Sequence, residues 1–63
     1  METIALADDF LVIFIDYMDG KLGYFRRVKS VKSGDGILLL EREDGEDDDG
    51  IPLVGIRSFK IRS

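Results

Sequence analysis

The stretch FLVIFIDY, residues 10 to 17, decides the fold. Seven of its eight residues are apolar, and most of these are β-branched or aromatic, which is the composition of a strand. Apolar residues occupy both alternating faces, so the segment predicts a central strand that is buried on two sides, with Asp16 as the polar exception near its end. The preceding residues 2 to 9 predict either a single helical turn or a short edge strand.

Turn signals divide the chain after this strand. Asp19-Gly20 predicts a type I′ hairpin turn, because this pair supplies the positive φ angles that such a turn needs. A second strand is expected from Leu22 to Lys32, with a bulge or bend near Lys29-Ser30, where its alternation changes face. A second turn, SGDG at residues 33 to 36, leads into a third strand over residues 36 to 43.

The last third of the chain predicts a loop and a final strand. Residues 43 to 50 (EDGEDDDG) predict a solvated loop, because consecutive acids repel one another. Pro52 marks a strand start or a sheet edge, since it has no amide hydrogen to donate. Gly55 predicts a sharp bend, and residues 57 to 62 alternate as a half-exposed strand does.

These segments predict one all-β domain over residues 1 to 63: a small SH3-like or Sm-like barrel of four to five short antiparallel strands. A chain of about 60 residues buries only about 60% of the surface that its unfolded form exposes. Stability is therefore expected from a well-packed β-core, or from a homodimer that extends it. The expected core consists of Ile13, Ile15, Val28, Leu38, Leu40, Phe59 and Ile61.

Composition excludes several classes of function. The sequence contains no His, Cys, Trp, Asn or Gln, so imidazole or thiolate catalysis, disulfides and Cys/His zinc sites are excluded. The serines have no histidine partner, and no Gly-rich phosphate loop precedes a helix, so neither an enzyme nor a cofactor is predicted. No apolar run approaches the roughly 18 residues of a membrane span, and no secretory signal is recognisable. A cytoplasmic protein is expected.

The net charge of −4 conceals a separation of charge along the chain. Residues 41 to 50 carry seven acids and one arginine, so the other 53 residues carry a net charge of +2. Five of the positive charges lie between Lys21 and Lys32, in a stretch without acids, and three more lie between Arg57 and Arg62. Net repulsion from phosphate argues against a general DNA coat protein but leaves room for a local basic face.

Aromatic and basic residues are interleaved in this basic stretch. Rings can stack on unpaired bases while Arg and Lys neutralise phosphates, as small barrels do on single-stranded nucleic acid. The alternative is that one ring packs inward and the basic residues form the exposed face of a half-buried strand. The candidate residues for binding an anionic ligand or single-stranded nucleic acid are Tyr24, Arg26, Arg27, Lys29, Lys32, Arg57 and Lys60.

The acidic residues 41 to 50 do not form a known cation-binding loop. Aligning Gly50 with the invariant glycine of an EF-hand places Gly45 at the first ligand position and Ile56 at the last, so the motif fails and no metal is predicted. We expect a flexible, solubilising loop. Two further roles stay open: covering the protein's own basic face in competition with an anionic partner, or binding a basic protein partner.

The order of segments resembles a compact WYL domain of bacterial transcriptional regulators, which is an Sm-like β-barrel. That family has an AL segment before a V-x-I-x-Y strand, a D-G turn and an R-x-V-x-P strand. The corresponding residues here are Ala5-Leu6, residues 13 to 17, Asp19-Gly20 and residues 26 to 30, with Ser30 in place of the proline.

The later segments of the WYL pattern also have counterparts. The strand that names the family falls on residues 36 to 40, with aliphatic residues replacing its Trp and Tyr, and the closing R-x-F-R-L segment resembles residues 57 to 61. Arg26 and Arg57 match positions that could contact an anionic ligand. The Rho-binding antitermination protein, another small acidic Sm-like barrel, is also similar in its D-G hairpin and in a closing strand compared here with residues 57 to 63.

The residues and these resemblances together predict a non-enzymatic binding module in bacterial or phage transcription regulation. Its ligand would be an anionic molecule or single-stranded nucleic acid, bound on a basic strand face. The alternative is a protein-protein interaction module that acts through an exposed strand edge or the acidic residues 41 to 50.

Overall fold

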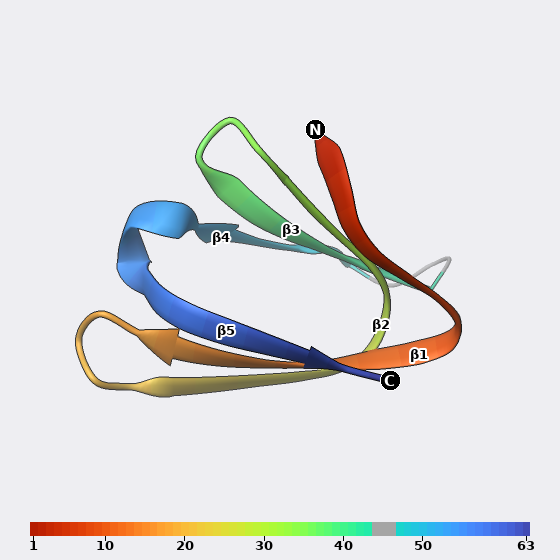
Figure 1. The fold of residues 1–63 in the computed structure, drawn as a ribbon, viewed down its shortest axis with the longest axis horizontal. Helices are drawn as coiled ribbons and strands as arrows, with labels where there is room; N and C mark the ends of the chain where they lie inside the picture. The colour runs from red at the N-terminus through yellow and green to blue at the C-terminus, as the bar shows by residue number, and fades with distance from the viewer. Residues whose placement is uncertain (44–46) are drawn as a thin grey trace.

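The computed structural model describes residues 1 to 43 and 47 to 63, which form a single curled antiparallel sheet (Figure 1). Neighbouring strands follow the order β4-β3-β2-β1-β5, and the sheet curls into a half-barrel. This confirms the predicted all-β fold of a small SH3-like or Sm-like barrel. The elements are β1 (Glu2–Tyr17), β2 (Leu22–Gly34), β3 (Ile37–Arg42), β4 (Asp49–Pro52), the 3-10 turn η1 (Leu53–Gly55) and β5 (Ile56–Arg62).

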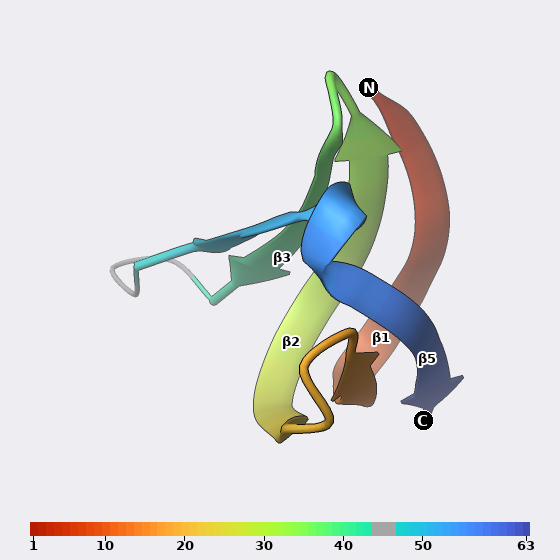
Figure 2. The same cartoon turned by 90° about the vertical axis from the view of Figure 1, so that its left-hand side faces the viewer.

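β1 is one continuous strand of 16 residues, so the helical turn considered for residues 2 to 9 is wrong. Its N-terminal half pairs with β2 alone, from Glu2 opposite Ser33 to Leu6 opposite Ser30. Its C-terminal half pairs with β2 on one side and with β5 on the other. Figure 2 shows the N-terminal half of β1 at the outer edge of the sheet. Local helix propensity is therefore overridden by pairing with β2.

Several bulges bend the long strands and curl the sheet. Between the Leu6–Ser30 and Leu11–Val28 pairs, residues 7 to 10 of β1 stand opposite Lys29 alone. One step further, Val12 faces two residues of β2, Arg26 and Arg27, and Arg27 has a φ of 60°. The pairing of β2 with β3 also shifts between Val28 and Ser30, which confirms the predicted bend near Lys29-Ser30. Bulges of this kind increase the local twist and turn a flat sheet toward a barrel.

The two Asp-Gly turns differ in type. Asp35 and Gly36 have φ values of 54° and 75° and connect the paired residues Gly34 and Ile37, as in a type I′ turn. In the first hairpin only Gly20 has a positive φ, of 89°, so the type I′ prediction for Asp19-Gly20 is wrong. The loop of this first hairpin has three residues, one more than the loop of a type I′ hairpin, and it ends in a bulge at Gly20.

Backbone hydrogen bonds explain the longer first loop. The Tyr17 N–H donates to the Lys21 carbonyl and the Gly20 N–H donates to the Tyr17 carbonyl, each at 3.0 Å. The Met18 N–H donates to the Gly55 carbonyl at 2.9 Å, which ties this loop to the start of β5. Met18 therefore belongs to the loop rather than to the strand pairing, and Gly20 supplies the positive φ of a three-residue turn.

The core lies on the concave side of the sheet. Its eight buried apolar residues are Leu11, Ile13, Ile15, Val28, Val31, Leu38, Leu40 and Ile51. Five of the expected core residues are among them, whereas Phe59 and Ile61 pack against the cluster but stay partly exposed, because β5 is an edge strand. Val31 joins Val28 in the core because the bulge between them changes the alternation of β2.

β4 begins within the predicted loop and takes up its last two residues. Asp49 and Gly50 belong to β4, so the predicted loop over residues 43 to 50 is too long, and its residues 44 to 46 lie outside the described part of the chain. Pro52 ends β4, an edge strand, which agrees with its expected position. Gly55 ends the 3-10 turn that bends the chain into β5. Within the described residues, no helix is long and apolar enough to cross a membrane.

Candidate nucleic-acid interface

Two of the predicted cations contact the bend in the sheet, by which we mean the bulge at residues 7 to 10 of β1 and the facing residues 26 to 30 of β2. The Arg27 guanidinium forms an ion pair with Glu43 at 3.2 Å and lies 5.1 Å from the centre of the Phe10 ring. The Lys29 ammonium lies 4.8 Å from the same ring centre and donates to the carbonyls of Asp8 and Asp9 at 3.2 and 2.9 Å. Both side chains are thus engaged by the bulge of β1 and by cation–π contacts with Phe10.

Lys32 is neutralised by a neighbour on β3. Its ammonium lies 2.7 Å from Glu41 Oε1, and the same oxygen accepts a hydrogen bond from the Ser30 hydroxyl at 2.7 Å. The hydrogen bond from Lys32, followed by that from Ser30, lowers the pKa of Glu41. A cation held this way contributes little free charge to an anionic ligand.

Arg42 links the end of β3 and the start of β4 to the same bend. Its guanidinium donates to Asp49 Oδ2 at 3.0 and 2.7 Å and to the Arg26 carbonyl at 2.9 Å. Its backbone N–H donates to Asp48 Oδ1 at 3.1 Å. Glu43, Asp48 and Asp49 therefore serve structural roles. No group of three or more potential metal ligands occurs within residues 1–43 and 47–63.

A different set of side chains gathers on the convex side of β2, β1 and β5. Tyr24, Phe14 and Lys60 occupy directly opposed positions on these three strands and form one row across the sheet. Both rings are exposed, Phe14 by 40% and Tyr24 by 59%, and their centroids lie 5.3 Å apart. Phe14 faces away from the core because Ile13 and Ile15, on either side of it, are buried.

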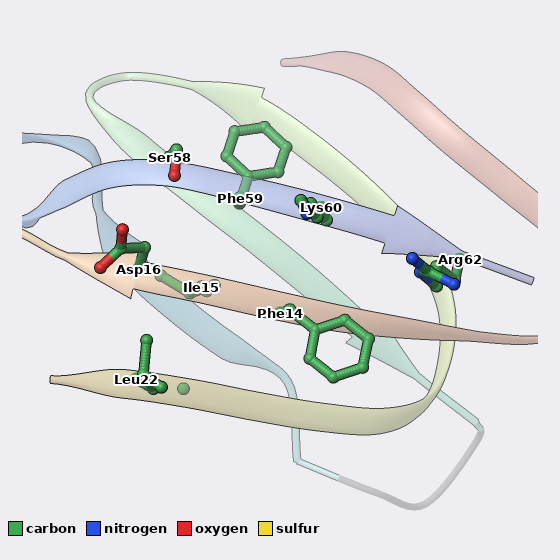
Figure 3. A pocket seen from close by; sticks show the side chains of 9 residues that line it. Phe14, Ile15, Asp16, Leu22, Ser58, Phe59, Lys60 and Arg62 are labelled. Atoms are coloured by element: carbon green, nitrogen blue, oxygen red, sulfur yellow. The ribbon is translucent and has the colours of Figure 1, made fainter.

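A row of side chains flanks this central row on each side. Asp16 lies between Leu22 on β2 and Ser58 on β5, and Val12 lies between Arg62 on β5 and the bulge that contains Arg26. Figure 3 shows Phe14, Lys60 and Arg62 on one side of the strands. We call this surface the outer face; it consists of Val12, Phe14, Asp16, Leu22, Tyr24, Arg26, Ser58, Lys60 and Arg62.

The outer face combines free cations with exposed rings. Among the described residues, no acid lies within ion-pair distance of Arg26, Lys60 or Arg62. An open hollow of about 440 Å³ is lined by Phe14, Asp16 and Lys60, among others. Leu22, which also lines this hollow, is one of the most exposed apolar residues described. Exposed apolar side chains beside unpaired cations are typical of a binding surface.

The structure divides the predicted site residues between two places. Tyr24, Arg26 and Lys60 lie on the outer face, whereas Arg27, Lys29 and Lys32 are engaged at the bend. Arg57 is exposed and lies at an irregularity in the pairing of β5 with β1, between the Ser58–Asp16 and Ile56–Tyr17 pairs, so it belongs to none of the three rows of the outer face.

Sequence reasoning missed Phe14 and Arg62 as site residues. Phe14 was assigned to a strand buried on both sides, although Asp16, two residues later, already indicated that this face of β1 meets solvent. For Arg62, the sequence indicates a positive charge near the C-terminus but not which face of the sheet carries it. Comparisons with protein-family models, with curated proteins and with solved structures give no match.

Proposed function

We propose that the protein is a non-enzymatic binding module that binds single-stranded nucleic acid on its outer face. The observation that carries this proposal is the row formed by Tyr24, Phe14 and Lys60, in which two exposed rings lie beside a free ammonium group. Exposed rings on a strand face offer stacking platforms to unpaired bases, and the cations on either side can follow the phosphate backbone.

The charge distribution favours a single strand over a duplex. Aromatic rings can stack only on bases that are not already stacked and paired. Non-specific binding to duplex depends mainly on neutralising many phosphates, and the net charge of −4 opposes this at long range. Local positive charge on the outer face comes from Arg26, Lys60 and Arg62. Arg27 and Lys32, by contrast, form ion pairs with Glu43 and Glu41.

The resemblance to WYL domains and to the Rho-binding antitermination protein suggests bacterial or phage transcription regulation as the setting. Of the two arginines that match ligand-contacting positions of the WYL pattern, Arg26 lies on the outer face and Arg57 lies at its border, next to Ser58. The proposal therefore assigns ligand contact first to Arg26 and keeps Arg57 as a candidate contact at the border of the outer face.

The proposal is tested by measuring how the two rings contribute to affinity. Fluorescence anisotropy with a labelled U-rich RNA oligonucleotide at low salt gives the dissociation constant for wild type and for Phe14→Ala/Tyr24→Ala. Base stacking contributes about 1–3 kcal/mol per ring, so the double variant should lose at least about tenfold in affinity. The control is Val54→Ala, which trims a side chain that is 88% exposed on η1. A folded double variant with wild-type affinity would contradict the proposal.

A second candidate, protein interaction by strand addition, is favoured by the free edge of β1. The N-terminal half of β1 has β2 on one side and no described strand on the other, and Ile4 and Leu6 are exposed there. Such an edge can accept a strand from a partner or from a second copy of this chain. Sedimentation of wild type and Leu6→Lys tests the homodimer. The charged side chain should block edge pairing and shift a wild-type dimer to monomer.

A further inference from the structure

We propose that Asp16 makes the outer face selective for a guanine base. In this account, which rests on the proposed function, one base stacks on the exposed face of Phe14 and turns its Watson–Crick edge toward the Asp16 carboxylate. The ligand class is thus narrowed from any single strand to strands with an unpaired guanosine.

Asp16 is the only acid among the residues of the outer face. It lines the same hollow as Phe14, Leu22, Ser58 and Lys60. It lies on β1, between Leu22 on β2 and Ser58 on β5 (Figure 3). Within residues 1–43 and 47–63, no hydrogen bond or ion pair to its carboxylate is found. By contrast, the acids Glu41 and Asp49 are held by neighbouring side chains. The carboxylate of Asp16 is therefore available to a ligand.

The chemistry of a carboxylate selects among the four bases. An ionised carboxylate only accepts hydrogen bonds and repels phosphate, so on a phosphate-binding surface it favours the part of the ligand that carries donors. The Watson–Crick edge of guanine presents two adjacent donors, N1–H and N2–H₂, which one carboxylate can accept together. Adenine and cytosine present one amino group on this edge, and uracil one imino group.

The spacing of the outer face suits a purine. Phe14 and Asp16 are two residues apart on one strand, which separates their Cα atoms by about 6.6 Å, comparable to the long dimension of a purine. Leu22, opposite Asp16 on β2, supplies an apolar wall. Ser58, opposite Asp16 on β5, carries a hydroxyl that can donate to guanine O6.

The test uses U-rich RNA oligonucleotides that differ in one central nucleotide: guanosine, inosine, adenosine or uridine. Inosine keeps the N1–H donor and lacks the N2 amino group. Wild type should bind the guanosine probe about 5- to 100-fold more tightly than the uridine probe, with inosine in between. Asp16→Asn should abolish this preference and bind the uridine probe at least as tightly as wild type does, because a negative charge is removed from the surface.

The matched control is Asp35→Asn, which removes the same charge from the turn between β2 and β3 and keeps a residue that tolerates positive φ. This variant should retain the guanosine preference. If wild type binds all four probes equally, or if Asp16→Asn keeps the preference, the inference about Asp16 is wrong while the proposed function stands. If wild type binds none of the probes, the proposed function fails as well.

Discussion

Phe14 on β1 and Tyr24 on β2 stand directly opposite each other, with ring centroids 5.3 Å apart and ring planes at 57°. A cross-strand aromatic pair of this kind stabilises a sheet by about 0.5–1.5 kcal/mol beyond the area that it buries. Stability alone does not require such a pair to stay exposed beside an unpaired cation, yet both rings do so next to Lys60. Exposure and charge together are the reason why we assign this pair to the proposed binding surface.

The salt dependence of RNA binding should report the free cations of the outer face. Three phosphate contacts, by Arg26, Lys60 and Arg62, correspond to a slope of log affinity against log salt of about −2 for a single strand. Lys60→Gln/Arg62→Gln leaves one of these contacts and should make the slope shallower, about −0.7. Arg27→Gln is the matched control, since Arg27 is already paired with Glu43. A larger change in slope for Arg27→Gln than for the double variant would relocate the site to the bend.

Acid should weaken the link between β2 and β3. The hydrogen bonds from Lys32 and then Ser30 lower the pKa of Glu41 below its ordinary value of 4.5, so the folded state favours the ionised carboxylate. This contribution to stability is fully present above pH 4.5 and is lost as the pH falls through the lowered pKa.

Urea titrations between neutral pH and about pH 3 check this linkage. Glu41→Gln should lose less stability across that range than wild type, and so should Lys32→Met, which removes the main cause of the lowered pKa. Glu2→Gln removes an equal charge at the start of β1 and serves as the comparison. If the free energy of unfolding fell equally with pH in wild type and in Glu41→Gln, the linkage would be refuted.

The turn at Asp35-Gly36 should depend on its glycine. Gly36 has a φ of 75°, a conformation that costs a residue with a Cβ about 1–2 kcal/mol, although no atom lies within 4 Å of the position that a Cβ would occupy. Gly36→Ala should therefore lower the free energy of unfolding by about that amount. Gly55→Ala also has open space around it but no positive φ, and it should have little effect. Equal losses for the two variants would show that backbone strain is not the cause.

Arg42 should contribute more to stability than its position near the surface suggests. Arg42→Ala removes both hydrogen bonds to Asp49 and the one to the Arg26 carbonyl, and we expect a loss of about 1–2 kcal/mol, because the pair is partly exposed and screened. Arg42→Lys should recover only part of this loss, since an ammonium lacks the planar fork. Arg57→Ala is the control. A loss in Arg57→Ala equal to that in Arg42→Ala would contradict the structural role.

Local signals in the sequence predicted the strands, the turn positions and most of the core. Apolar runs, the two Asp-Gly pairs and Pro52 each act within a few residues, so their consequences are visible without pairing information. At Asp19-Gly20 the turn type differs from the prediction, and the Met18 N–H of this loop bonds to the Gly55 carbonyl, a contact distant in the sequence that local signals do not indicate. The bulge at residues 7 to 10 is likewise not indicated by any local sequence pattern.

The candidate site was harder to predict, because it depends on register. Whether a lysine is free or neutralised is decided by the residue opposite it, as with Lys32 beside Glu41 on β3. Arg26 and Arg27 are adjacent in the sequence, yet the bulge and the positive φ of Arg27 send them into different surroundings. Phe14 belongs to the proposed binding surface because β5 places Lys60 beside it.

An amide NMR titration of the protein with mixed short single-stranded RNA, first at low and then at high salt, tests the central claim most directly. We predict chemical-shift changes concentrated at residues 12 to 16, 22 to 26 and 58 to 62, which carry the outer face, and their loss as salt rises. Changes confined to residues 2 to 7, or no change at any RNA concentration, would contradict the claim and favour the edge of β1 as the functional surface.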